Sequence, residues 1–227
     1  FSKYPRMTYL GLYKNEEEKQ NIKIVEKNGI KIAFVSFNQY VNGMTYQKKL
    51  PYMINFHEST MMENMKKARE NADIVIVSCH WGIEYDYYPN TFQKNMAKQL
   101  ADAGADVIIG THTHTLQDVE YIQRADGKRT LVAYSLGNFV SGMLEESCQL
   151  EGMLSFDIEK KKIKNVVFTP LVNYYTLTGK RERHDFSVYR LKDYTNKLVE
   201  KHGFPNLTIS HMKEEVKQKV KNIKIDM

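Results

Sequence analysis

Three histidines stand just after two apolar runs of the sequence. His80 follows the run Asp73–Cys79, and His112 and His114 come shortly after the run Asp106–Ile109. Imidazole is a ligand for Zn, Mn, Fe or Ni, and a His-x-His pair on an irregular turn can direct both rings at one ion or at two neighbouring ions. We therefore predict that the three histidines bind metal. The competing interpretation is that they are hydrogen-bonded structural residues.

The two apolar runs have the character of buried strands in a parallel sheet. A helix predicted over Thr91–Ala103 and ended by Gly104 connects them. A strand–helix–strand crossover of this length makes its two strands parallel, so their carboxyl ends emerge along one sheet edge, where ligand sites of open α/β sheets lie. We expect His80, His112 and His114 to converge there, although more than thirty residues separate the first from the second.

The remaining pattern predicts a mixed α/β chain in two parts. A hairpin is expected over residues 22–37 around Asn28-Gly29, and a helix over residues 58–71 on the spacing of Met61, Met62, Met65 and Ala68. Strands are expected at 130–136, 152–158 and 164–169. Residues 180–227 are expected to form a basic, mainly helical extension. Within it we expect a strand at 187–191, a helix near 191–201 and a last helix through Met212, Val216 and Val220. The predicted division is therefore 1–179 and 180–227.

Composition excludes several classes of protein. The chain has 227 residues, a net charge of +6, 42% hydrophobic and 26% charged residues, which excludes disordered and collagen-like chains. Residues 180–227 carry 12 Lys and Arg against 7 Asp and Glu, but these charges alternate along helices, so we interpret them as a solvated face and expect no nucleic-acid partner. Cys79 and Cys148 have neither the spacing of a metal site nor the number needed for a disulfide framework. They therefore do not indicate whether the protein works in a reducing or an oxidising compartment.

Four sequence blocks carry a resemblance to a known family. They are Cys79-His-Trp-Gly-Ile-Glu-Tyr85, the segment 104–114 ending in Gly-Thr-His-Thr-His, Leu116-Gln117, and Tyr134-Ser-Leu-Gly-Asn-Phe139. Together they resemble the CapA family, the poly-γ-glutamate capsule biosynthesis branch of the calcineurin-like metallophosphoesterase superfamily. The resemblance covers roughly the first three quarters of the chain, and the order and spacing of the blocks make it specific.

The resemblance implies roles for individual residues. His80, His112 and His114 match metal-ligand positions, although Thr111 and Thr113 stand where the family more usually has His and Pro. Two ions of Mn, Zn or Fe are implied for the complete protein.

Two further residues are candidates at this site. Glu84 matches the acidic position of the first block and is the candidate catalytic residue, acting in proton transfer or orienting a ligand; a solvated loop glutamate is the alternative. Asn138 is a candidate substrate-binding residue, with a purely local turn role as its alternative.

The family also supplies Asp, Glu and Asn ligands from blocks that have no counterpart in this sequence. The implied fold is a two-sheet α/β/β/α sandwich of the metallophosphoesterase type, here incomplete at the amino end. The implied function is a metal-dependent hydrolase of capsule or poly-γ-glutamate biosynthesis at the cell envelope. The alternative is a non-catalytic assembly or export subunit that retains the scaffold.

The same resemblance implies partners and a location. The expected partners are an anionic envelope polymer or its precursor, other capsule synthesis subunits and the missing amino-terminal part of the same domain. The sequence has no apolar run of the roughly 18 to 20 residues that a spanning helix needs. We expect an extracytoplasmic protein, anchored to the membrane through a segment upstream of residue 1.

Overall fold

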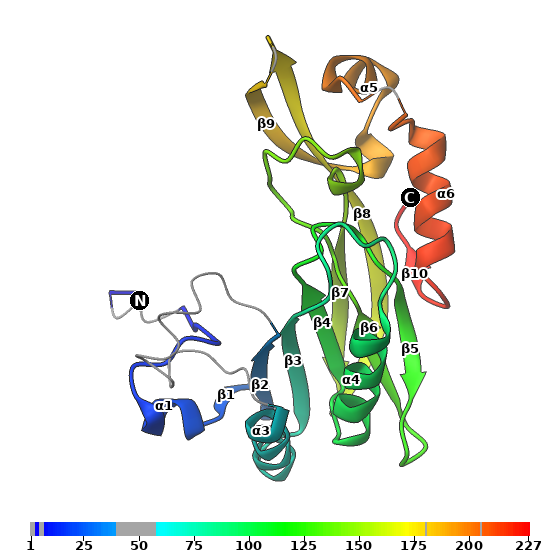
Figure 1. Ribbon diagram of the computed structural model, residues 1–227. Helices are drawn as coiled ribbons and strands as arrows, with labels where there is room; N and C mark the ends of the chain where they lie inside the picture. The colour runs from blue at the N-terminus through cyan, green and yellow to red at the C-terminus, as the bar shows by residue number, and fades with distance from the viewer. Residues whose placement is uncertain (1–2, 5–6, 40–57, 180, 205) are drawn as a thin grey trace. The chain divides into compact units, whose positions relative to one another are not determined.

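The computed structural model describes residues 3–4, 7–39, 58–179, 181–204 and 206–227 (Figure 1). The chain forms two compact units. Unit 1 comprises Phe1–Trp81, Lys94–Ile109 and Ile122–Leu131, and unit 2 comprises Gly82–Gln93, Gly110–Tyr121 and Val132–Met227. Each unit is described by itself below.

The first sheet has the strand order β1-β2-β3-β4-β6-β5. Its strands are β1 (Lys23–Lys27), β2 (Ile30–Asn38), β3 (Ile74–His80), β4 (Val107–Thr111), β5 (Val119–Gln123) and β6 (Arg129–Ala133), and the helices among them are α1 (Glu16–Gln20), α3 (Glu58–Asn71) and α4 (Thr91–Asp102). The predicted neighbours, the strands that end near His80 and before His112, are adjacent in this order as β3 and β4. Strand β5 was not predicted, because its sequence Val-Glu-Tyr-Ile-Gln is short and carries only partial alternation.

The predicted hairpin and the helix after it are confirmed. Strands β1 and β2 pair antiparallel around Asn28 and Gly29, whose φ angles of 53° and 72° are those of a two-residue hairpin turn. Strand β2 then pairs parallel with β3 through the crossover helix α3. That helix lies against β2 (Figure 1) and buries Met61, Met65 and Ala68 completely, as their helical spacing predicts. Met62 is only half-buried.

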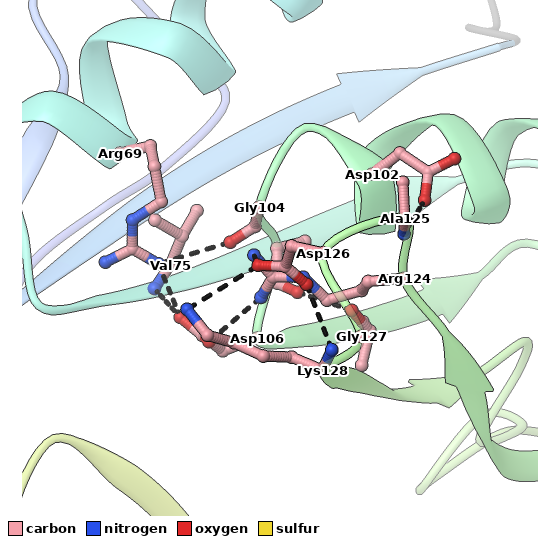
Figure 2. Close-up of polar contacts among 12 residues, drawn as sticks. Arg69, Val75, Asp102, Gly104, Asp106, Arg124, Ala125, Asp126, Gly127 and Lys128 are labelled. Carbon is pink, nitrogen blue, oxygen red and sulfur yellow. Dashed lines mark hydrogen bonds and ion pairs between the residues drawn. The ribbon is translucent and has the colours of Figure 1, made fainter.

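A network of arginines and aspartates fastens these elements in unit 1 (Figure 2). The Asp106 carboxylate, just before β4, accepts hydrogen bonds from the backbone N–H of Val75 at 2.8 Å and from Arg69 of α3 at 2.9 Å. Arg124, whose side chain is almost fully buried, pairs with Asp106 at 3.5 Å and with Asp126 at 3.0 Å. One carboxylate therefore joins α3, β3, β4 and the turn between β5 and β6.

Unit 2 contains a second sheet built on one long strand. Strand β8 (Lys162–Thr178) pairs with β7 (Leu150–Glu159), β9 (Glu182–Arg190) and β10 (Lys224–Ile225). Lys160 and Lys161 form the β7–β8 turn with φ angles of 48° and 60°. The prediction that the last strand of this meander ends at Thr169 is wrong. Strand β8 continues through Pro170, which pairs with Gly152, a residue with no side chain.

The carboxyl-terminal segment packs on this sheet. The predicted helix over 191–201 begins later than expected, at α5 (Asn196–His202), because Thr195 caps it by accepting a hydrogen bond from the backbone N–H of Leu198. The residues 191–193 instead form a 3₁₀ turn, and α6 (Ile209–Lys219) is the predicted last helix. The predicted boundary between residues 179 and 180 stays a prediction.

The mixed α/β class with two sheets and flanking helices is confirmed. Among the described residues, no helix is long and apolar enough to cross a membrane.

Candidate functional site

The turn that carries His112 and His114 has an unusual backbone. Both histidines have positive φ angles, 105° and 64°, a region that costs a residue with a Cβ atom of order 1–3 kcal/mol. Between them, Thr113 is completely buried, and its hydroxyl donates to the carbonyl of Thr115 at 3.2 Å. With Thr113 turned into the interior between them, the two imidazole rings lie near each other, with centroids 6.4 Å apart.

Asn138 fixes the orientation of the His114 ring. The Asn138 Oδ1 atom lies 2.7 Å from His114 Nδ1, and its Nδ2 group donates to the His114 carbonyl at 3.4 Å. An amide oxygen only accepts hydrogen bonds, so Nδ1 carries the proton and the lone pair of the neutral ring is on Nε2. This is the arrangement of a metal-binding histidine whose other nitrogen is held by a neighbouring oxygen. Asn138 therefore contacts the site, and its predicted contact with substrate stays a prediction.

The free nitrogen of His114 faces a carboxylate. Its Nε2 atom is 3.8 Å from Glu84 Oε1, beyond direct hydrogen-bond distance. Metal bonds of about 2.0–2.2 Å from each atom can span such a separation. Imidazole and carboxylate are donor types that a divalent cation takes, so His112, His114 and Glu84 are the residues that would supply them. Within the described residues, however, they are not grouped closely enough to hold an ion as they lie.

His112 has the protonation state that metal binding requires. Burial lowers the pKa of His112, and the neighbouring His114 lowers it further, although Glu84 opposes both effects. The ring is consequently neutral at physiological pH and keeps a lone pair for a ligand bond.

The loop that carries Glu84 is hydrogen-bonded to the histidine turn. The backbone N–H of Tyr85 donates to the Thr113 carbonyl at 2.8 Å, and the carbonyl of Asp86 accepts from the Thr115 hydroxyl at 2.6 Å and from Gln117 at 3.0 Å. Sequence reasoning missed these supporting residues. Their sequence signal is weak, since Thr and Gln within a loop are ordinarily exposed, whereas Thr115 and Gln117 are completely buried here.

The structure brings together four of the five predicted site residues in unit 2, namely Glu84, His112, His114 and Asn138. His80 belongs to unit 1, where it ends β3; it pairs in register with Asn38, and its carbonyl accepts from the Gln39 N–H at 2.8 Å. The convergence of His80 with the other two histidines stays a prediction. Within the part of the chain that the structure describes, no three His, Cys, Asp or Glu side chains are grouped closely enough to hold a metal ion.

A buried carboxyl group that sequence reasoning missed lies beneath Asn138. Glu151 of β7 is completely buried, and a Cβ atom on Gly137, which has a φ of 80°, would lie only 3.0 Å from its Cγ. Burial raises the pKa of Glu151 to about 8, and the backbone N–H groups of Phe139 and Asn138 oppose that rise. Neither N–H group forms a hydrogen bond of good geometry with the carboxyl oxygens. Glu151 is therefore a mostly neutral support for the turn that presents Asn138.

Comparison with known proteins identifies relatives. The model of a family described as bacterial capsule synthesis protein PGA_cap matches residues 3–143. The chain is 35% identical over 139 residues to the capsule biosynthesis protein CapA of Bacillus anthracis, covering 59% of this chain and 33% of that protein. It is 31% identical over 160 residues to the PGA biosynthesis protein CapA of Bacillus subtilis (strain 168), covering 70% and 41%. The chain thus spans about a third to two fifths of these relatives.

Among solved structures, the chain is similar to the NAD nucleotidase NadN of Haemophilus influenzae. The sequence identity is 14%, the TM-score is 0.40, and the match covers 90% of this chain and 34% of that one. A likeness at this level supports no conclusion about activity.

Proposed function

Because this chain belongs to the family of bacterial capsule synthesis proteins, we propose that the full-length protein is a metal-dependent hydrolase acting on a phosphoryl or amide-like group of an anionic envelope polymer or its precursor. The names of its relatives make poly-γ-glutamate the favoured polymer. The observation that carries the proposal is the His114 ring, which is fixed by Asn138 with its free nitrogen facing Glu84.

The proposed roles follow from these contacts. His112 and His114 offer ring nitrogens, Asn138 holds the His114 ring, and Glu84 supplies a carboxylate oxygen or accepts a proton from the attacking water. A bound divalent cation supplies a hydroxide nucleophile near neutral pH and neutralises charge on the substrate. His80 is proposed as a further imidazole ligand. A pair of ions also needs an anionic bridge, which we propose is supplied by a part of the full-length protein outside this chain.

A non-catalytic role in envelope assembly or export is the second candidate. It is favoured by the lack, among the described residues, of a group of three donors close enough to hold an ion. In that case the same scaffold would bind the polymer or other capsule synthesis subunits. For either role we propose an extracytoplasmic location.

The test is a paired assay of this chain and the full-length protein on an aryl phosphate diester and on a γ-glutamyl substrate, each with Mn²⁺ or Zn²⁺ and with chelator. We expect chelator-sensitive turnover by the full-length protein that is lost in His112→Ala and retained in His184→Ala, an exposed histidine of β9. Inactivity of the full-length protein on both substrates would shift the proposal to the assembly role.

A further inference from the structure

Helix α6 buries a lysine against the site-bearing segments of unit 2. The Lys219 side chain is 3% exposed, and its Nζ atom donates to the carbonyls of Tyr87 at 2.8 Å and Leu116 at 2.6 Å. It also pairs with Glu215 at 3.3 Å. These three acceptors match the three donors of an ammonium group, which offsets the cost of burying the charge.

Two tyrosine rings complete the enclosure of this ammonium group. Its Nζ atom lies 4.8 Å from the Tyr87 ring centroid and 5.2 Å from that of Tyr88, within the range of a cation–π contact. The groove lined by these tyrosines and by Glu214 and Glu215 has the composition of a site for an organic cation. Lys219 already provides that cation from within the chain, so we assign the groove to an internal clamp.

The two carbonyls that Lys219 binds belong to the two segments that form the candidate site. Tyr87 lies three residues after Glu84, and Leu116 lies two residues after His114. The end of α6 is fixed beside them, since Lys221 pairs with Asp118 at 2.8 Å and its backbone N–H donates to the Val119 carbonyl at 2.9 Å. One side chain therefore holds the Glu84 loop and the histidine turn at a common point.

We propose that Lys219 is a positioning residue that sets the separation of Glu84 from His114. The carboxyl-terminal helix then acts as a structural part of the site, although it lies outside residues 3–143, which the family model matches. The effect on metal binding rests on the proposed function, whereas the clamping of the loop does not.

The test compares Lys219→Met with Lys217→Met in the full-length protein. Methionine is an unbranched side chain only one atom shorter than lysine, and it removes the charge and the donors. Lys217 is an exposed residue of the same last turn of α6. The first readout is limited chymotrypsin cleavage after Tyr85 and Tyr87, which stand in the clamped loop. We expect cleavage there to accelerate about tenfold in Lys219→Met and to stay at the wild-type rate in Lys217→Met.

The second readout is the dissociation constant for Zn²⁺ or Mn²⁺. Loss of an outer support of metal ligands typically weakens affinity 10- to 100-fold, so we expect about a tenfold loss in Lys219→Met and none in Lys217→Met. If Lys219→Met does not fold, Glu215→Gln, which removes only the counter-ion, should accelerate cleavage in the same direction by less. Equal cleavage rates in the folded Lys219 and Lys217 variants, or in Glu215→Gln and wild type, would overturn the clamp. Absence of metal binding by the wild-type protein alongside accelerated cleavage would leave the clamp standing and contradict the proposed function.

Discussion

At the scale of single residues, the candidate site depends on the two oxygen-bearing side chains that face His114. Asn138 holds one ring nitrogen, and Glu84 faces the other across a gap suited to a cation. The positive φ angles of His112 and His114 are maintained by the buried threonines around them, and such strain is commonly retained where it serves a site.

Replacing Asn138 should weaken metal binding without unfolding the protein. In Asn138→Ala the His114 ring loses the amide oxygen that faces Nδ1, so both tautomers become accessible. We expect a 10- to 100-fold loss of Zn²⁺ affinity by isothermal titration calorimetry of the full-length protein. Asn206→Ala, at an exposed turn residue, is the control and should bind as wild type does. Equal Zn²⁺ affinities of Asn138→Ala and the wild-type protein would show that Asn138 only stabilises the turn in which it lies.

Glu151 should make stability depend on pH. Its pKa is about 8 in the folded protein and near the ordinary 4.5 when unfolded, so the folded state holds the proton more tightly. The stabilisation is complete below about pH 4.5 and is lost as pH rises through 8. Glu151→Gln, which imitates the neutral form, should therefore gain stability relative to wild type between pH 5 and 8, as measured by urea unfolding. A difference that is constant over this range would contradict the assignment.

At the scale of secondary-structure elements, the strands and helices with strong patterns were predictable and those with weak patterns were not. The apolar spacing of α3 and the Asn28-Gly29 turn predict their elements because each has one local cause. The continuation of β8 through Pro170 and the late start of α5 depend on the partner residue Gly152 and on the Thr195 cap, which local patterns did not reveal. In the site, spacing indicated the histidines, whereas Glu151 and Lys219 act through burial that only the fold creates.

Removing the Asp106 carboxylate should loosen several elements of unit 1 together. Arg69, Arg124 and the Val75 N–H all lose an acceptor in Asp106→Ala, and Arg124 is almost completely buried. We expect a loss of about 2–4 kcal/mol in the free energy of unfolding. Asp126→Ala removes a carboxylate at the rim of the same network and should cost less than about 1 kcal/mol. Similar costs for both would show that Asp106 does not join the elements.

The aromatic packing around α5 should give way in acid. His202 is buried, its Nδ1 atom lies 2.8 Å from the Tyr194 hydroxyl, and burial lowers its pKa to about 4 from an ordinary 6.5. The folded state therefore disfavours the charged ring, and stability falls as pH drops from about 6.5 to 4. His202→Phe, which cannot be protonated, should flatten this part of the stability curve in thermal unfolding followed by circular dichroism. An unchanged dependence of stability on pH in His202→Phe would contradict this role of His202.

At the scale of the whole molecule, the chain spans a third to two fifths of the length of its relatives. Its candidate site offers imidazoles and one carboxylate, and among the described residues no three such donors are grouped closely enough to hold an ion. We therefore expect the isolated 227-residue chain to bind Mn²⁺ or Zn²⁺ more weakly than the full-length protein does, and to show no appreciable phosphoesterase activity. Equilibrium dialysis of the two proteins measures the difference in affinity. Tight stoichiometric binding by the isolated chain, lost in His112→Ala, would show that its site is complete.

Metal binding by the histidine turn can be seen by anomalous diffraction from crystals of the full-length protein grown with Zn²⁺, recorded on both sides of the zinc absorption edge. We expect an anomalous peak about 2.0–2.1 Å from His114 Nε2, shared with His112 or Glu84. The peak should vanish in crystals of His114→Ala and persist in those of His211→Ala, an exposed histidine of α6. A fully occupied zinc site elsewhere in the protein, with no anomalous density beside His112 and His114, would contradict the account.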